Sequence, residues 1–245
     1  QLERAITPKS RLIIVNSPAR YKMAIISKTV VPDAALVDPE TTTTLPPYLT
    51  ACTGIDALTH AIEAYVSTAS SPVVDVHALA AIRLVWNNIE AAVSSPGNLA
   101  ARENMSLASL QAGLAFSNAS LGAVHALAHA VGGFLDLPHG ECNALLLEHV
   151  VRFNFPAAPE RYRRIAAEIG IDARGMTDQE CSRRIVDALA GLRVRVGIGG
   201  GLGERGVRAA DVPELAVHAL KDACIVTNPR RVALADAQTI YGDAT

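Results

Sequence analysis

The chain has 245 residues, of which 50% are hydrophobic and 19% are charged, with a formal net charge of −2 and a pI near 6.4. This length is enough to bury a large hydrophobic core. The small net charge gives no electrostatic reason to bind nucleic acid or an anionic membrane surface. We therefore expect a small molecule as the partner, with no nucleic acid and no membrane.

The sequence shows no signal peptide, no membrane-spanning run and no cysteine motif. Residues 1–20 lack the basic, apolar and small-residue order of a signal peptide, and no run of about twenty uncharged apolar residues is present. The cysteines have no CxxC spacing, so we expect reduced thiols without an assigned role. They are Cys52, Cys142, Cys181 and Cys224. These features predict a soluble, cytoplasmic protein.

The first part of the chain is typical of β-strands. Three short apolar runs are bounded by Asn, Ser, Pro or Asp: Leu12–Val15, Met23–Ile26 and Ala34–Val37. They predict the edge of an α/β layer.

From Asp38 onward the pattern changes to long segments rich in Ala and Leu with helical spacing. A turn rich in Thr and Pro, residues 41–47, leads into them. The helices expected in chain order are 49–66, 73–93, 99–117, 121 to the glycine pair 132–133, 141–153, 159–169, 177–194, 212–224 and 234–241. We therefore predict a mainly α fold, with an all-helical body.

Two of these helices carry polar pairs suited to a buried divalent metal. Residues four apart lie on one face of a helix, so Asp56 and His60 project side by side, as do His125 and His129. A third imidazole, His139, lies in a predicted Pro-His-Gly turn that aims it at the same place. A carboxylate with two or three imidazoles suits iron(II) or zinc. Spacing alone leaves His125 and His129 equally suitable as ligands.

A hydrolytic use of this metal is disfavoured. A zinc-protease motif needs a Glu directly after the first histidine as general base, and Ala126 occupies that place. Glu63 lies one turn beyond His60 and Glu141 follows His139, but either can instead support a ligand. The sequence therefore offers no evident general base for a metal hydrolase.

Longer motifs around these residues resemble one family. The segments that carry the resemblance are TGIDALTHAIEAY at 53–65, GLAFSN at 113–118, GAVHALAH at 122–129, PHG at 138–140, NPR at 228–230 and IY at 240–241. They are similar to the group III, iron-containing alcohol dehydrogenases, from about Arg11 to the end of the chain. Members of that family join an N-terminal Rossmann-like α/β domain to a C-terminal helical domain, in a dehydroquinate synthase-like architecture with the iron between them.

The resemblance implies roles for individual residues. The implied metal ligands are Asp56, His60, His125 and His139. His129 matches a histidine beside the nicotinamide that helps to move the proton, so it is implied to be catalytic and to contact the cofactor. Phe116 matches a residue of the substrate pocket, and Lys22 matches a lysine near the cofactor ribose.

The resemblance also implies the reaction and the organisation of the chain. It implies hydride transfer between a primary alcohol or aldehyde and NAD or NADP, with Fe²⁺ or Zn²⁺ as the metal. It further implies a homo-oligomer, at least a dimer. Residues 1–38 would be a remnant of the dinucleotide-binding domain, and residues 39–245 the helical iron-binding catalytic domain.

One part of the family pattern is missing. The Gly-Gly-Gly-Ser turn, the Asp after it and the Pro-Thr-Thr cofactor loop have no counterpart before Arg11. The GxGxxG match at 201–206 follows the helical body instead of opening a βαβ unit, so we do not interpret it as a phosphate site. As printed, the chain is predicted to bind metal, to bind NAD(H) weakly and to have little dehydrogenase activity. The alternative hypothesis is a catalytically silent helical module for metal binding or oligomerisation.

Overall fold

The computed structural model describes residues 36–245, and within this range every regular element is helical. The α-helices are α2 (Pro47–Val66), α3 (Pro72–Ser94), α4 (Leu99–Ala119), α5 (Ala123–Leu135), α6 (His139–Asn154), α7 (Pro159–Glu168), α8 (Asp178–Arg195), α9 (Val212–Ala219) and α10 (Leu234–Ala244). The 3₁₀ helices are η2 (Pro39–Thr42), η3 (Phe155–Ala157), η4 (Gly203–Arg205) and η5 (Ala223–Thr227). The mainly α fold is therefore confirmed for this part of the chain.

Most of the residues predicted to form strands lie outside the part of the chain that the structure describes. Leu12–Val15 and Met23–Ile26 lie outside the described residues, as does Lys22. Of the third run only Leu36 and Val37 are described, and neither is in a regular element.

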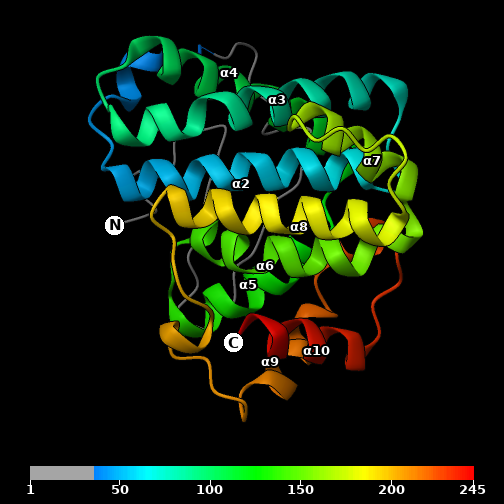
Figure 1. Ribbon diagram of the computed structural model, residues 1–245. Helices are drawn as coiled ribbons and strands as arrows, with labels where there is room; N and C mark the ends of the chain where they lie inside the picture. Colours follow the sequence, from blue (N-terminus) through cyan, green and yellow to red (C-terminus); the bar gives the residue numbers. More distant parts are fainter. Residues whose placement is uncertain (1–35) are drawn as a thin grey trace, which may run out of the picture.

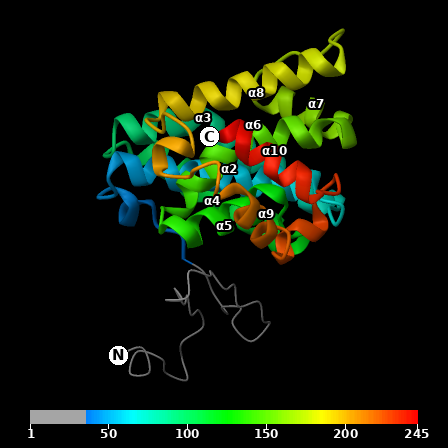
Figure 2. The same ribbon diagram turned by 90° about the horizontal axis from the view of Figure 1, so that it is seen from below.

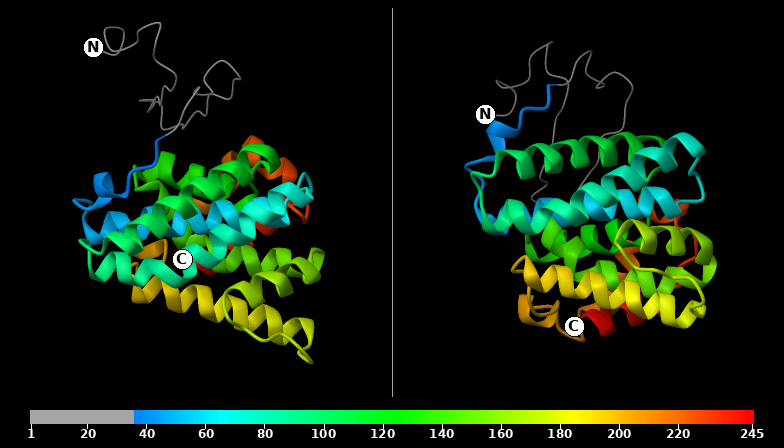
Figure 3. Two further views of the ribbon diagram at one scale, coloured as in Figure 1. Left: turned by 90° about the horizontal axis from the view of Figure 1, so that it is seen from above. Right: turned by 45° about the horizontal axis from the view of Figure 1, so that its top comes forward.

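Helix α2 lies at the centre of the bundle. It packs against α3 and α4 on one side and against α6 on the other, and α6 in turn contacts α5, α8 and α10 (Figure 1). The turned views keep α8 along one edge of the bundle, away from α4 (Figures 2 and 3). Residues of α2 can therefore reach both halves of the core. Within the described range, no helix combines the length and the apolar character needed to cross a bilayer.

Local sequence explains where several helices begin. The side chains of Ser71 and Asn98 accept hydrogen bonds from Val74 N and Ala101 N, which caps α3 and α4. Thr177 and Glu180 form a reciprocal capping box on α8. These caps satisfy amide groups that a helix end otherwise leaves without partners.

Small side chains allow the central helices to approach closely. Ala61, Ala81 and Ala115, one from each of α2, α3 and α4, are fully buried. At Gly54 of α2 a Cβ atom would lie 2.7 Å from Ile89 Cδ1 of α3, so a larger residue would displace the Ile89 side chain. The result is a tightly packed support for the polar residues of α2.

Three predicted helix boundaries are wrong. Helix α5 continues past its glycine pair to Leu135 and ends where Asp136 adopts a left-handed conformation, with φ of 56°. The predicted helix 212–224 is divided, because the Asp222 side chain accepts a hydrogen bond from Cys224 N and starts η5. Helix α6 begins at His139, with Pro138 as its N-cap, and not at residue 141. His139 is therefore the first residue of a helix and not part of a preceding turn.

Candidate metal centre

Three helices each bring two polar residues, four positions apart, to one point in the core. Helix α2 contributes Asp56 and His60, and helix α5 contributes His125 and His129. Helix α6 contributes His139 and, one turn later, a buried asparagine. The potential ligand atoms of Asp56, His60, His125 and His139 all lie within 4.8 Å of one another. The structure thus brings together the four residues whose ligand role the family resemblance implied.

The spacing of these atoms fits a tetrahedral metal ion. Asp56 Oδ1 lies 3.4 Å from His125 Nε2, 3.6 Å from His139 Nε2 and 3.8 Å from His60 Nε2. Ligands held at roughly 2.1 Å from a tetrahedral ion are roughly 3.4 Å apart. The donor set of one carboxylate and three imidazoles suits iron(II) or zinc, so the residues fit the metal with little movement.

A buried glutamate orients one of the imidazoles. Glu63 Oε2 lies 2.6 Å from His125 Nδ1, and Glu63 Oε1 accepts a hydrogen bond of 2.6 Å from Val124 N at the start of α5. At Gly122 a Cβ atom would lie 2.8 Å from Glu63 Oε1, so glycine leaves room for this carboxylate. Because Glu63 accepts the Nδ1 hydrogen of His125, Nε2 is the ring nitrogen that faces the other ligands.

Burial and neighbouring charges set the protonation states. Burial alone would lower the pKa of His125, but hydrogen bonds to the Asp56 and Glu63 carboxylates raise it to about 9. Burial lowers the pKa of His60 to about 3, and the nearby His125 adds to this effect. Burial acts to raise the pKa of Asp56, but His125 and the other histidines hold it well below its usual range. The site therefore combines an ionised Asp56, a neutral His60 and a protonated His125, and His125 must release its Nε2 proton to bind a cation.

His129 lies beside the four-residue group and not within it. Its Nδ1 is 2.8 Å from Asp222 Oδ2, and its ring stacks on that of His139 at 5.1 Å between centroids. Burial acts to raise the pKa of Asp222, but the hydrogen bond from His129 lowers it to about 2. His129, Asp222 and Cys224 form a second close group of polar side chains. The fold therefore separates His125 from His129, which helical spacing left equivalent.

The asparagine of α6 was missed by the sequence analysis. Asn143 is fully buried, and its Nδ2 lies 2.6 Å from Asp56 Oδ1 and 3.2 Å from both His125 Nε2 and His139 Nε2. A helix predicted to begin at residue 141 hid the spacing of four between His139 and Asn143. That spacing is the signal that would have pointed to it.

Comparison with known proteins identifies the family. The sequence model described as "Fe-containing alcohol dehydrogenase family, C-terminal" matches residues 50–245. The chain belongs to this family. Alcohol dehydrogenase 4 of Saccharomyces cerevisiae is 48% identical over 219 residues, which are 89% of this chain and 56% of that protein. 1,3-Propanediol dehydrogenase of Citrobacter freundii is 44% identical over 219 residues, which are 89% of this chain and 57% of that protein.

Solved structures agree with this membership. The crystal structure of a 1,3-propanediol oxidoreductase has a TM-score of 0.88 and 42% identity, covering 90% of this chain and 58% of that one. Sulfoacetaldehyde reductase from Bifidobacterium kashiwanohense, solved in complex with NAD⁺, has a TM-score of 0.82 and 32% identity, covering 91% and 57%. The chain thus spans somewhat more than half the length of these relatives, and the resemblance to iron-containing alcohol dehydrogenases is confirmed.

In this member of the iron-containing alcohol dehydrogenase family, Phe116 covers one side of the ligand group. Its ring stacks on that of His60, with 4.5 Å between centroids and 24° between planes, and it is partly buried. The ring therefore limits the access of water to His60 from α4.

Two glycines of the segment 201–206 have a packing role. A Cβ atom at Gly201 would lie 2.7 Å from Ala244 O, and one at Gly203 would lie 2.8 Å from Thr245 O. Arg205 donates to Glu141 Oε1 at 2.7 Å. This loop therefore joins the end of α10 to α6.

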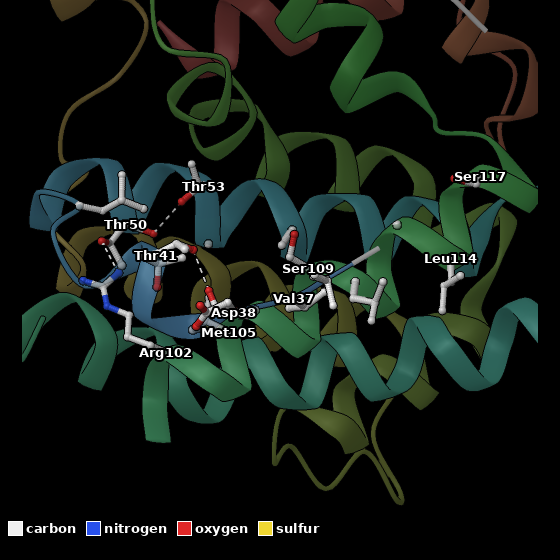
Figure 4. Close-up of a pocket in the computed structure, with 18 residues that line it drawn as sticks. Val37, Asp38, Thr41, Thr50, Thr53, Arg102, Met105, Ser109, Leu114 and Ser117 are labelled. Atoms are coloured by element: carbon white, nitrogen blue, oxygen red, sulfur yellow. Dashed lines mark hydrogen bonds between the residues drawn. The ribbon is translucent and has the colours of Figure 1, made fainter. Parts of the chain in front are cut away.

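A cavity of about 590 Å³ lies between α2, α4 and residues 36–45 (Figure 4). Arg102 and Thr50 lie at one end, where Arg102 Nη1 donates to Thr50 Oγ1 at 2.8 Å, and Leu114 and Ser117 lie at the other. Thr53 donates its hydroxyl proton to Leu49 O at 2.8 Å. Asp56, His60, His125 and His139 are not among the residues that line this cavity.

Proposed function

We propose that this chain is the helical, metal-binding catalytic part of an NAD(P)-dependent alcohol dehydrogenase, which interconverts a primary alcohol and its aldehyde. The observation that carries the proposal is the convergence of Asp56, His60, His125 and His139 at tetrahedral spacing in a chain of this family. The names of the relatives, which include 1,3-propanediol dehydrogenase and sulfoacetaldehyde reductase, support alcohols and aldehydes as the substrate class.

Each residue of the site has a separate role in the proposed reaction. When bound, iron(II) or zinc supplies Lewis-acid chemistry toward an alcohol or carbonyl oxygen, and the nicotinamide accepts or donates the hydride. Asp56 and the three imidazoles hold the ion, and Glu63 keeps His125 in the tautomer whose Nε2 is free to bind it. His129 is held through Nδ1 by Asp222, so its Nε2 is the atom that gives or takes the proton. Phe116 shields the His60 side from water.

Further assignments follow from the same proposal. We assign Fe²⁺ as the metal with Zn²⁺ as the alternative, because both accept this donor set. NAD or NADP is the cofactor, and Lys22 and His129 are the residues of this chain that would contact it. We further propose residues 1–38 as the remnant of the cofactor domain, residues 39–245 as the catalytic domain, a homo-oligomer and a cytoplasmic location.

Metal stoichiometry on anaerobically purified protein tests the proposal. We expect close to one iron or zinc ion per chain, lost in His139→Ala but retained in His129→Ala. His77→Ala is the matched control, since His77 is a half-buried histidine of α3 that pairs with Gln111. A native chain that binds no metal, or equal loss of metal in His129→Ala, contradicts the ligand assignment.

A titration with NADH separates this proposal from a silent metal-binding module. Blue-shifted cofactor fluorescence on binding supports the dehydrogenase. Metal binding at full stoichiometry without any response to NADH supports the module instead.

A further inference from the structure

Asn143 occupies an unusual position among the proposed ligands. Its Nδ2 is within hydrogen-bonding distance of three of the four donor atoms, at 2.6 Å from Asp56 Oδ1 and 3.2 Å from the Nε2 atoms of His125 and His139. The amide nitrogen therefore caps the face of the ligand group that these three atoms form.

The hydrogen atoms of this amide match the lone pairs around it. A carboxamide NH₂ group has two hydrogens to donate. One is directed to Asp56 Oδ1, and the other is shared by the two imidazole nitrogens. In the neutral form of His125 the Nδ1 hydrogen is directed to Glu63, so the Nε2 lone pair faces Asn143 and the other ligands. A neutral imidazole nitrogen has a single lone pair, which a bound ion would take, so the hydrogen bond from Nδ2 to Asp56 Oδ1 is the one that can remain beside the ion.

The carboxamide oxygen of Asn143 does not explain why an asparagine occupies this position. Asn143 is fully buried, and among residues 36–245 none forms a hydrogen bond with its Oδ1. A buried amide oxygen without a partner destabilises a fold. An apolar residue would avoid that cost, so the contacts of Nδ2 are what the asparagine contributes.

Helix packing holds Asn143 in place. A Cβ atom at Gly140 would lie 2.2 Å from Cys52 O, so the first turn of α6 rests directly on the backbone of α2. Asn143 follows one turn after His139 and shares its helix face. The amide is therefore fixed relative to Asp56 by the contact between the two helix backbones.

We propose that Asn143 is a positioning residue of the metal centre, whose carboxamide holds Asp56, His125 and His139 at the spacing of metal ligands. This inference rests on the proposed function, because it needs the four-residue group to bind an ion. Residues that orient metal ligands typically change metal affinity by about 10- to 100-fold when removed. Asn143 acts through the ligands and is not itself assigned as a ligand.

Metal affinity in two variants tests this role. Asn143→Leu keeps most of the side-chain volume and removes the amide, and Asn143→Ala removes both. We expect each variant to raise the dissociation constant for Zn²⁺ and Co²⁺ by about 10- to 100-fold in competition with a chelator. We also expect the d–d absorption band of bound Co²⁺ to change, because the carboxylate loses its hydrogen bond.

Asn154→Ala is the matched control. Asn154 is also buried, but it pairs with Asn228, so its loss is expected to lower stability without changing the metal dissociation constant. Native protein that binds no metal overturns the proposed function and this inference together. Native protein that loses metal in His139→Ala, while both Asn143 variants bind it as tightly as the native chain or more tightly, overturns this inference alone.

Discussion

Two sets of buried carboxylates differ in how their charge is balanced. On α6, Glu148 pairs with Arg193 at 2.9 Å and Glu141 pairs with Arg205 at 2.7 Å. On α2, Asp56 and Glu63 face imidazoles, and among the described residues neither forms an ion pair with Lys or Arg.

This difference separates a structural role from a ligand-binding one. Arg193 also donates to the carbonyls of Ile198 and Gly200, so its pair with Glu148 fastens the loop that follows α8. The α6 pairs are thus complete within the chain. The α2 carboxylates instead face imidazoles, whose nitrogens can bind a metal once they are deprotonated, an arrangement that an added cation completes.

The largest expected loss of stability comes from breaking the buried ion pair between Glu148 and Arg193. Arg193→Met leaves the Glu148 carboxylate buried without a partner and is expected to lower the free energy of unfolding by about 3–5 kcal/mol. Urea unfolding in the presence of chelator measures this change. The metal dissociation constant of the folded protein should not change. A large change in it would show that the two sets of carboxylates are not independent.

A smaller effect is expected from a substitution of Glu63, one of the two α2 carboxylates that face imidazoles. Glu63→Gln replaces one acceptor oxygen by an NH₂ group that faces either His125 Nδ1–H or Val124 N–H. The metal dissociation constant should rise by about 10- to 100-fold, which is about 1.4–2.8 kcal/mol. Chelator competition measures it, with Glu90→Gln, on the exposed face of α3, as the control. An unchanged dissociation constant would remove Glu63 from the metal centre.

The pair of Asp222 and His129 is half-buried and should matter less, in a pH-dependent way. The pKa of Asp222 is lowered to about 2 in the folded chain, against about 3.9 in an unfolded one. Its stabilising contribution is therefore present above about pH 4 and is lost as the pH falls toward 2. Asp222→Asn should cost about 1 kcal/mol of unfolding free energy at pH 7.

Chelator-treated protein unfolded by urea at pH 7, 4 and 2.5 tests this pH dependence. The difference between the native chain and Asp222→Asn should shrink across that series. A difference that stays constant down to pH 2.5 would contradict the assigned pair.

The smallest effect is expected at the surface. Arg174 and Asp172 form a pair at 2.7 Å, but their side chains are 91% and 61% exposed. Arg174→Ala should leave the urea midpoint of unfolding unchanged within measurement error, because solvent screens the pair. A clear fall in the midpoint would show that the exposure of a pair does not predict its contribution to stability.

Periodicity in the sequence predicted the helical body and two of the three residue pairs at the site. It failed at α6, because Pro138 and Gly140 suggested a turn, whereas Pro138 caps the helix and Gly140 packs against Cys52 O. That contact joins parts of the chain that are far apart in sequence, so the local spacing of residues cannot predict it.

The same limit applies to the histidines of α5. Whether His125 or His129 joins Asp56 depends on which of them faces α2, and the partners that fix each ring are 62 and 93 positions away in the chain. Periodicity defines a helix face but not the neighbour that the face meets. Family resemblance supplied the assignment that spacing left open.

The contacts at the metal centre join segments that are far apart along the chain, since Asn143 and Asp56 are separated by 87 positions. An ion held by α2, α5 and α6 would leave as soon as any one of these helices moved away, so it would stabilise only the state in which all three are together. The gain depends on the free metal concentration and is about 2.7 kcal/mol at 100 times the dissociation constant. With the ion bound, α2, α5 and α6 are therefore expected to unfold together.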